Sequence, residues 1–444
     1  MSNCFPPDPA RAISRRSFLR WTGSAGLLVG LSRSLPGLAP GARAEAPREL
    51  VLISQQGATP DRALPKLLEA FKAANPGVNT KVMLFPEEKF VALYTASQAA
   101  GEQVDLLMLN GQDLRRYATS QALLPLDDLP YKNRFIPEAL KPVTIENHLW
   151  GVPSGAAGGF VIFVNRALLN KYQLDFPKTY DELKAAAATL KKAGVNAFTH
   201  PGKVIYMWPV WFFTTFAQTT DNRSIERTVE ILDGRGKFTD PDVVQALDLV
   251  FQFARDKMFT PGVFSLDFPN AQSEFLTGKA AFYLFHDSLA KPVMEANAPG
   301  MELDFMLMPN LVGRPVTSQY PGAACGVVLA IPAKIDPARR ELARKLLDFL
   351  SSDQSDQESV ALNGGAVPVN QQAPTPNVPV YRKEKEEISK LVTYLDWFYP
   401  PEITRGFQEG LQAGLAGRIK AEDLAKNLQA TLERLYGSGY KFIG

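Results

Sequence analysis

The sequence predicts an α/β protein in which strands alternate with helices. Short apolar runs alternate along the chain with longer segments whose apolar residues recur at helical spacing. Glycine and proline stand between these segments, as at Asn75-Pro76-Gly77, where a helix should end and a strand should begin. The 444 residues are 45% hydrophobic and 21% charged, which is typical of a globular protein with a sizeable core. A chain of this length usually forms more than one domain, so we expect two.

The first part of the sequence predicts strand, helix, strand, helix and strand in succession. Thr59-Pro60 supplies an N-cap followed by the first helical position, and four apolar residues then follow at helical spacing. Because strands joined by helices form right-handed crossovers, we expect a parallel sheet covered by helices. The predicted elements are a strand at 50–54, a helix from 59 carrying Leu64, Leu67, Leu68 and Phe71, an alternating strand with Val78, Thr80, Val82 and Leu84, a helix at 87–100, and a strand at 104–109.

The same alternation continues to the C-terminal end. Thr179-Tyr180-Asp181-Glu182 has the pattern of a capping box and opens an alanine-rich helix that should end at Gly194. Asp336-Pro337 should cap a later helix with a leucine face. Further strands are expected at 160–165, 281–285, 303–308 and 327–331, a proline-rich link at 371–380, and helices beyond it. In sheets of this kind, ligands bind beyond the carboxyl ends of the strands.

Residues 1–44 have the pattern of a twin-arginine export signal. Arg15-Arg16 precedes Phe18-Leu19, a weakly apolar run follows at 23–31, and Ala42-Arg43-Ala44 provides a small-residue cleavage site. The run is shorter than the ~20 residues that span a bilayer. We therefore expect cleavage near Ala44 and a soluble product outside the cytoplasm, periplasmic or otherwise extracytoplasmic.

Removal of this segment changes the charge and the cysteine count. It contains six of the 48 Lys+Arg residues and one of the 46 Asp+Glu residues, so the remainder holds 42 and 45, a formal charge of −3. This near-neutral balance gives no indication of nucleic-acid binding or of an anionic membrane surface. Cys4 would leave with the signal, and Cys325 alone cannot form an internal disulfide.

The motifs of metal sites and common catalytic sites are missing from the sequence. Three histidines and one mature cysteine offer little for transition-metal binding, and no zinc-site, EF-hand, P-loop or dinucleotide-binding spacing occurs. Ser154 stands in Pro-Ser-Gly rather than in a nucleophile elbow. The glycine-rich stretch 155–159 is interpreted as a flexible crossing. We therefore expect no cofactor, no metal and no enzymatic activity.

Several stretches of the sequence, taken in order, resemble segments of one known protein family. "LPKLLEAFKAANPGVNTKVML" and "VDLLMLNGQDLRRYATSQALLPLDDL" resemble its first lobe. "LWGVPSGAAGGFVIFVNRALLNKY" and "FPKTYDELKAAAATLKKAG" resemble its crossing into the second lobe. "FLTGKAAFYLFHD" is similar to one of its strands, and "GVVLAIPAKIDPARRELARKLLDFLSSDQSDQ" with "GGAVPVN" resembles its return to the first lobe. This ordered set, which covers most of residues 48–436, resembles the extracellular solute-binding proteins of ABC importers, the family that includes the maltose-binding-type sugar receptors.

This resemblance implies a two-lobed periplasmic-binding-protein fold with interwoven lobes and a cleft that closes by hinge motion. It implies a first lobe at 45–157 plus 325–373 and a second at 158–324 plus 374–444. The closed form would dock on the transmembrane subunits of a permease, and we expect the receptor itself to be a monomer. The sequence departs from the maltose type at His286-Asp287-Ser288, where that type has an aromatic residue shortly after the strand.

Polar candidates for ligand contact follow the predicted strands. Gln55 and Gln56 follow the first strand, and Asn110 and Gln112 follow the strand at 104–109. Side-chain amides at these places can form hydrogen bonds with hydroxyl groups, although each could also belong to an ordinary turn. Three further candidates lie in the predicted second lobe or at its end: His286, Asp287 and Gly322. The His–Asp pair could bind a pair of hydroxyls or form a structural hydrogen bond.

Aromatic candidates come from two stretches, "KVIYMWPVWFF" at 203–213 and "YLDWFYPPE" at 394–402. Aromatic clusters are more often core than binding surface, and we assign Phe212 and Phe213 to the core. The resemblance places Trp208 near the cleft and Trp397 and Tyr399 at a second place where the family brings aromatic rings to ligand. We add Trp211 because it lies three residues after Trp208, so that both could share one helix face.

The sequence therefore predicts a receptor that binds a small solute, most simply a carbohydrate, for an ABC importer. Two alternatives remain open from the residues. A receptor of the same fold could bind a polyamine or another small polar solute, with Asp287 in a carboxylate-lined pocket. An exported carbohydrate-active enzyme is the alternative of another class, because the twin-arginine route also carries enzymes.

Overall fold

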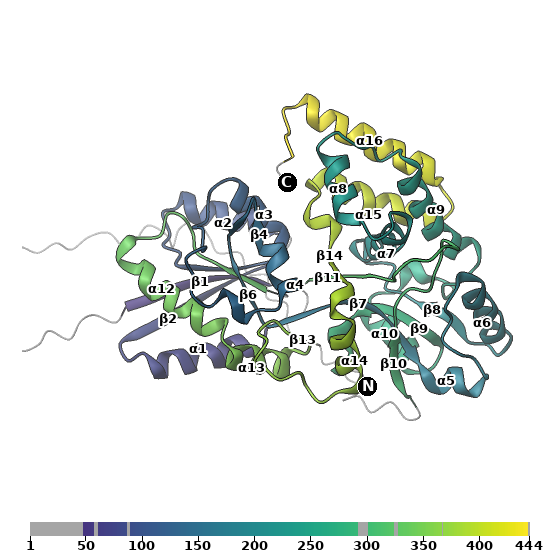
Figure 1. Ribbon diagram of the computed structural model, residues 1–444, viewed down its shortest axis with the longest axis horizontal. Helices are drawn as coiled ribbons and strands as arrows, with labels where there is room; N and C mark the ends of the chain where they lie inside the picture. Colours follow the sequence, from purple (N-terminus) through teal and green to yellow (C-terminus); the bar gives the residue numbers. More distant parts are fainter. Residues whose placement is uncertain are drawn as a thin grey trace, which may run out of the picture. The chain divides into compact units, whose positions relative to one another are not determined.

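The computed structural model of the chain describes residues 48–56, 61–86, 89–291, 301–323, 327–365 and 367–442 (Figure 1). The export signal, the N-cap predicted at Thr59-Pro60, and Cys325 lie outside these residues. Within them, no helix is long and apolar enough to cross a membrane.

The first sheet has five strands in the order β2-β1-β3-β12-β6. β1 pairs in parallel with β2 and with β3, as the alternation of strands and helices predicts. The parallel arrangement predicted from residues 50–109 therefore holds for these three strands, whereas β12 is antiparallel to β3 and to β6. The strands are β1 (Arg48–Gln56), β2 (Val78–Pro86), β3 (Leu106–Leu109), β6 (Val152–Ser154) and β12 (Val327–Ala330).

α1 (Ala63–Ala74) is the first of several helices that bury an apolar face against the first sheet. Asp61 Oδ1 accepts hydrogen bonds from the backbone N–H groups of Ala63 and Leu64, so an aspartate caps this helix. The four predicted apolar residues of α1 are buried. The accompanying helices are α2 (Phe90–Ala99), α3 (Gly111–Thr119), α4 (Pro137–Leu140), α12 (Pro337–Leu350) and α13 (Asp353–Asn363).

In β2 the expected alternation reverses near its end. Val78, Thr80 and Val82 are half-buried as predicted, but Leu84 is 54% exposed while Met83 and Phe85 pack against the core. The four-residue apolar face predicted for this strand is therefore right for three positions.

The second sheet follows the order β14-β11-β7-β9-β8, with β10 and β13 also paired to β7. β7 is antiparallel to β9, β10, β11 and β13. The glycine-rich stretch that we expected to be a flexible crossing is part of this strand from Ala156 onward. The strands are β7 (Ala156–Asn165), β8 (Asn196–Thr199), β9 (Ala280–His286), β10 (Leu303–Met306), β11 (Tyr320–Ala323), β13 (Val367–Pro368) and β14 (Leu391–Thr393), and a separate hairpin joins β4 (Thr144–Ile145) to β5 (His148–Leu149).

A second hydrophobic core forms around the helices that follow β7 and β8. Thr179 caps α6 as predicted, because its hydroxyl accepts the backbone N–H of Glu182. The helices of this core are α5 (Arg166–Lys171), α6 (Tyr180–Lys192), α7 (Pro209–Thr219), α8 (Ser224–Leu232), α9 (Pro241–Arg255), α15 (Pro401–Leu415) and α16 (Ala421–Gly437). Two further helices, α10 (Phe268–Leu276) and α14 (Pro379–Glu387), bury their apolar residues in the core that includes the first sheet.

Short 3-10 turns join these elements. They are η2 (Lys132–Arg134), η3 (Lys141–Val143), η4 (Ile205–Met207), η5 (Val263–Ser265), η6 (Asp287–Leu289), η7 (Ile388–Lys390) and η8 (Leu395–Trp397).

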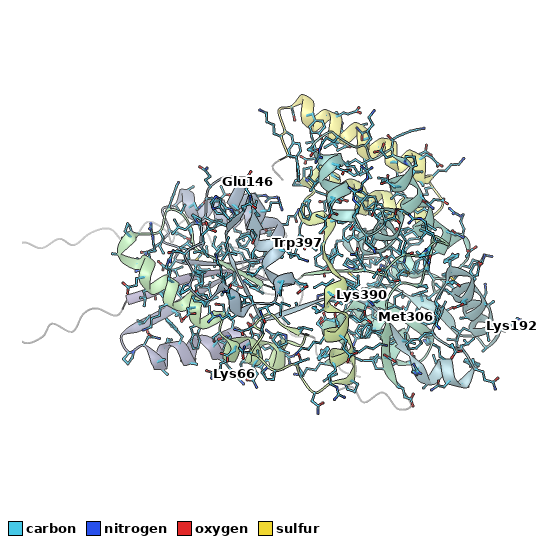
Figure 2. The ribbon with its side chains drawn as sticks, in the orientation of Figure 1. Lys66, Glu146, Lys192, Met306, Lys390 and Trp397 are labelled. Atoms are coloured by element: carbon cyan, nitrogen blue, oxygen red, sulfur yellow. The ribbon has the colours of Figure 1, made fainter. Side chains whose placement is uncertain are left out.

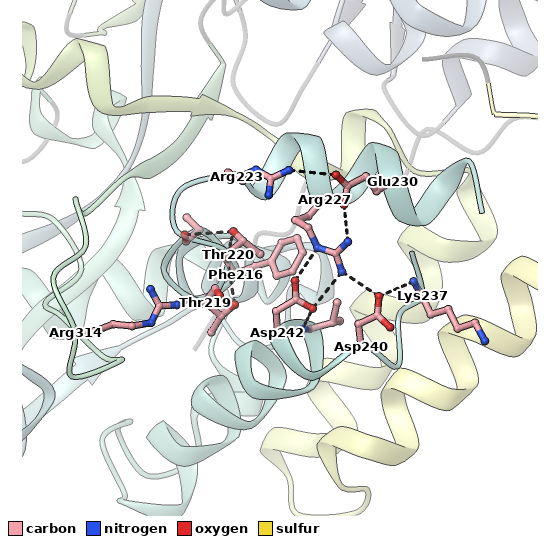
Figure 3. Close-up of polar contacts among 12 residues, drawn as sticks. Phe216, Thr219, Thr220, Arg223, Arg227, Glu230, Lys237, Asp240, Asp242 and Arg314 are labelled. Carbon is pink, nitrogen blue, oxygen red and sulfur yellow. Dashed lines mark hydrogen bonds and ion pairs between the residues drawn. The ribbon is translucent and has the colours of Figure 1, made fainter. Parts of the chain in front are cut away.

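Arg227 fixes the connection between α8 and α9 through three carboxylates (Figure 3). Its guanidinium lies 2.6 Å from Glu230, 3.0 Å from Asp240 and 2.7 Å from Asp242. Hydrogen bonds to Asp242 raise the pKa of this guanidinium against the opposing effect of burial, and those to Glu230 and Asp240 raise it further. Because the Arg227 side chain is only 17% exposed, this network is expected to stabilise the second core more than a surface pair would.

Asp356 joins two of the segments that run between the sheets. Its carboxylate accepts the backbone N–H of Gly155, which lies between β6 and β7, at 2.6 Å. It also accepts the N–H of Asn370, just beyond β13, at 3.0 Å. Asp356 is fully buried, and burial raises its pKa to about 7 although both backbone donors favour the charged form.

Candidate functional site

Gln55 and Asn110 meet at the carboxyl ends of β1 and β3. The Gln55 side-chain oxygen accepts the Asn110 backbone N–H at 2.8 Å, and its amide nitrogen donates to Asp113 at 2.9 Å. The Asn110 side chain in turn accepts the Asp113 N–H at 2.9 Å and caps α3. Burial raises the pKa of Asp113, while Arg116 and Gln55 oppose that rise. The two predicted residues are thus brought together in a fixed network at the start of α3.

Two other predicted residues lie in the same neighbourhood. Gln112 is half-buried in the first turn of α3. The backbone of Gln56 ends β1, but its side chain is outside the described part of the structure.

Trp397 contacts the start of α3 from η8, a segment almost 300 residues away in the sequence (Figure 2). A Cβ atom placed on Gly111 would lie 2.1 Å from two ring carbons of Trp397, so the indole occupies the space that a side chain would need. Next to it, the Arg115 guanidinium lies 4.6 Å from the centre of the Phe398 ring. Gly111 therefore allows the indole to lie directly on the backbone beside Asn110 and Gln112.

Trp397 is the last member of a continuous series of six aromatic rings, which we call the aromatic strip. Consecutive ring centres lie 6.1, 5.5, 6.2, 5.9 and 5.6 Å apart. Tyr206 is 49% exposed, and the other five rings are half-buried. In order, the strip consists of Tyr206, Phe268, Phe285, Phe160, Tyr394 and Trp397.

Four members of the strip were missed by the sequence reasoning and one, Tyr206, was noted without being chosen. Phe285 lies in the last two residues of β9, Tyr394 directly follows β14, and Tyr206 follows β8. Phe160 joins them because β7 runs antiparallel to β9 and pairs Phe160 with His286. Aromatic residues at strand ends were the available signal, but the pairing of β7 with β9 could not be read from spacing.

His286 and Asp287 form the predicted pair beside this strip. His286 Nδ1 lies 2.7 Å from Asp287 Oδ1, and its ring stands edge-on to Phe160 with ring centres 5.5 Å apart. The His286 side chain is 34% exposed, whereas that of Asp287 is fully buried. Burial acts to lower the pKa of His286, but the charge and hydrogen bond of Asp287 outweigh it and raise that pKa. The partly exposed His286 side chain can therefore contact a ligand directly. The buried Asp287 can affect a ligand only through its contact with His286.

Four candidates are corrected by the structure. Trp208 and Trp211 are fully buried, and their indole N–H groups donate to Gly202 O and to His200 Nδ1. Tyr399 is 5% exposed and stacks on Phe407 in the second core. A Cβ atom on Gly322 would lie 2.4 Å from the Gly158 carbonyl oxygen, so this glycine allows close strand pairing and presents no surface to a ligand.

A separate cavity of about 370 Å³ lies between α6, the start of β8 and the end of α9. Its lining includes Lys191, Lys257 and Phe259 but none of the candidate residues. Among the described residues, no group of histidine, cysteine, aspartate and glutamate side chains is placed to hold a metal ion.

Comparison with known proteins finds relatives that match most of the chain. A family model described as "Bacterial extracellular solute-binding protein" matches residues 66–387. A binding protein of Brucella abortus is 27% identical in an alignment 362 residues long, which covers 78% of this chain and 81% of the relative. An ABC transporter extracellular-binding protein of Pyrococcus horikoshii is 20% identical in an alignment that covers 57% of this chain and 62% of the length of that protein.

Solved structures are similar over most of their length. A Bacillus subtilis binding protein in an open conformation aligns with a TM-score of 0.76 at 15% identity, covering 89% of this chain and 99% of that one. A maltose-bound Thermotoga maritima (T. maritima) protein aligns with a TM-score of 0.70 at 23% identity, covering 87% and 99%. These likenesses establish the two-lobed α/β fold of maltose-type binding proteins. The chain belongs to the bacterial extracellular solute-binding protein family of ABC importers.

Proposed function

We propose that this receptor binds a carbohydrate and delivers it to the transmembrane subunits of an ABC importer. The observation that carries the proposal is the aromatic strip, which ends against the amide-bearing start of α3. A sugar ring has apolar C–H faces and polar edges, and therefore suits aromatic rings that lie beside amide groups.

The similar structures support a carbohydrate as the ligand. They include a chitin oligosaccharide binding protein, a maltose-bound protein and a sugar transporter protein in complex with stachyose. Their identity to this chain is between 17% and 23%, so they support the class of ligand rather than any one sugar.

The electrostatics of the site disfavour a polyamine. A polyamine receptor requires carboxylates that face the ligand, but the fully buried Asp287 already contacts His286. Asp113, a second carboxylate next to the candidate residues, is also buried and contacts Gln55 and Arg116. The neutral amides, the aromatic rings and the partly exposed His286 are among the accessible groups of the site.

The protein works outside the cytoplasm, as its family does. We further propose that the twin-arginine segment directs its export, that cleavage follows Ala44, and that the lobes divide near residues 157, 324 and 373. The receptor would act as a monomer that binds its ligand without chemical change.

A thermal-shift screen of the mature protein tests this function. The panel contains neutral mono- and oligosaccharides, polyols, polyamines and amino acids, and each compound is recovered and analysed afterwards. A ligand at ~1,000 times its Kd stabilises the fold by about 4 kcal/mol, which moves the melting temperature by several degrees. A shift with sugars that are recovered intact supports the proposal. A shift with polyamines alone, or cleavage of the sugar, contradicts it.

A further inference from the structure

The cavity between α6, β8 and the end of α9 is large enough for a small organic molecule. Its volume is about 370 Å³, and none of the candidate site residues lines it. At ~30 Å³ per water molecule, this space corresponds to about twelve waters, or to a ligand with about as many non-hydrogen atoms. The volume also lies within the range of known small-molecule sites.

Short side chains on both helices leave this space open. Ala187 comes from the alanine-rich α6, and Ala254 comes from the last turn of α9. Ala197 of β8 is a third alanine in the lining. Because alanine leaves room that a leucine or phenylalanine would fill, the cavity follows from the composition of these elements.

Larger apolar side chains form one wall of the cavity. Phe259, Phe264 and Leu415 all belong to the lining, and each is buried in or packs against the second core. Phe259 stands edge-on to two core tryptophans, with ring centres 5.0 Å from Trp211 and 5.6 Å from Trp208. This wall offers a ligand an apolar surface that the core holds in place.

The charged residues in the described lining are both cationic. Lys191 of α6 and Lys257, which follows α9, line the cavity, and no acid lines it with them. In the part of the chain that the structure describes, neither lysine forms an ion pair. Asp256, the neighbour of Lys257, accepts the Tyr180 hydroxyl at 2.8 Å and pairs with Lys184 at 3.6 Å. The cavity thus combines an apolar wall with positive charge that suits an anion.

Lys257 occupies a backbone position that usually belongs to glycine. Its φ is 56°, in the left-handed region. Its N–H donates to the Ala254 carbonyl and the Met258 N–H donates to that of Phe253, which is a common ending of a helix. α6 ends with the same pattern but has Gly194 at this position, with φ of 76°. Since a side chain is crowded in this conformation, Lys257 stabilises the fold less than glycine would, which makes it a candidate for a role in binding.

We propose that this cavity is a second binding site, which takes a small carboxylate with an apolar body. The apolar body lies on the wall formed by Phe259 and its neighbours, and the carboxylate contacts the ammonium groups of Lys191 and Lys257. The two cations favour a carboxylate over a neutral apolar molecule, and the apolar wall favours it over a small inorganic anion. The site goes beyond the proposed sugar site, since no ring of the aromatic strip lines it.

NMR titration of the mature protein with octanoate tests the site. Removal of the export signal leaves four of the five tryptophans, so few indole N–H signals need to be assigned. Those of Trp208 and Trp211, next to Phe259, should shift and saturate with a Kd of roughly 1 mM, and those of Trp150 and Trp397 should stay in place. Octanamide, the neutral counterpart, should bind at least about threefold more weakly, and acetate, which lacks the apolar body, should cause no shift.

Two results of this titration would overturn the proposal. One is the absence of a saturable shift at Trp208 and Trp211 up to ~10 mM octanoate, a concentration well above the expected Kd. The other is octanamide binding as tight as that of octanoate, which would make the cavity an apolar site that does not recognise charge.

Variants of the two lysines test the role of charge without endangering the fold. Lys257→Gly removes the ammonium group and gives the left-handed position its usual residue, so the melting temperature should rise while octanoate binding weakens about three- to tenfold. Lys191→Gln should weaken binding by a similar factor. Lys192→Gln, at the next position of α6 but outside the lining, is the matched control and should bind as wild type does. Wild-type octanoate affinity in both Lys257→Gly and Lys191→Gln would overturn the proposal.

A third variant tests the place of binding. Ala187→Leu fills the cavity with a side chain that helices accommodate well, so it should abolish the octanoate shifts at Trp208 and Trp211 in a protein that remains folded. Octanoate binding of wild-type strength in this variant would place the ligand elsewhere and overturn the proposal.

Discussion

Replacing Trp397 and Trp208 by alanine, one at a time, distinguishes a residue of the proposed ligand-binding surface from a residue of the hydrophobic core. Trp397 and Trp208 were expected from sequence to act alike, but the structure places Trp208 wholly inside the second core and leaves Trp397 half-buried at the end of the strip. The two substitutions should therefore affect different quantities. Trp397→Ala should weaken sugar binding with little loss of stability, and Trp208→Ala should lower stability.

The expected magnitudes follow from the area that each ring buries. If a sugar covers about a third of an indole surface of ~150–250 Å², the contact contributes roughly 1–2 kcal/mol at about 25 cal/mol per Å². Trp397→Ala should then raise the Kd about tenfold. For Trp208, loss of a buried ring costs roughly 3–5 kcal/mol of unfolding free energy. The lost hydrogen bond to Gly202 O adds to that cost.

The assay combines calorimetric titration for Kd with urea unfolding for stability, on wild type and both variants. The account predicts a binding defect in Trp397→Ala and an unfolding defect in Trp208→Ala. Unchanged affinity in Trp397→Ala would refute the placement of the ligand on the strip. A Trp208→Ala variant of wild-type stability would refute the assignment of that ring to the core.

Further predictions concern the Arg227 network, the buried carboxylate of Asp356, the start of α3 and the length of the ligand. Arg227→Met should lower the unfolding free energy by about 1–3 kcal/mol in urea melts, because three carboxylates lose their common partner; exposed Arg405→Met, which breaks one pair with Glu409, should cost less. The raised pKa of Asp356 stabilises the fold below its ordinary value of 3.8, and this contribution is lost as the pH rises through about 7. Melting temperatures of Asp356→Asn should therefore fall less than those of wild type across that window, and equal slopes would contradict this. Gly111→Val should displace Trp397 and weaken sugar binding, whereas Gly77→Ala, in an open turn, should leave Kd unchanged. Because the strip contains six rings in series, a linear oligosaccharide should bind more tightly than its monomer in calorimetry, and equal affinity would limit the site to one sugar unit.

The elements of the fold could be predicted because each depends on local pattern. The helical spacing at residues 64–71 and the caps at Thr179 and Asp336 gave helices close to those in the structure. Strand order and direction could not be predicted in this way. β7 receives partners from segments more than a hundred residues away, and nothing in its own sequence specifies them.

The candidate site was predicted in part, for a related reason. Gln55 and His286 lie within the last two residues of β1 and β9, and Asn110 directly follows β3, so local pattern placed all three at strand ends. Whether an aromatic residue lines the binding surface or lies in the hydrophobic core depends on which helix covers it. Sequence spacing alone could therefore not distinguish Trp208 and Tyr399 from Trp397. The Gly111 contact with Trp397 joins positions almost 300 residues apart and required the tertiary structure.

Calorimetric titration of the mature protein with a series of neutral linear oligosaccharides tests the central claim most directly. The account predicts saturable binding of one sugar per chain, recovery of the sugar unchanged, and weaker binding in Trp397→Ala. It would be contradicted if no carbohydrate bound while a polyamine or an amino acid did, or if the sugar were recovered cleaved.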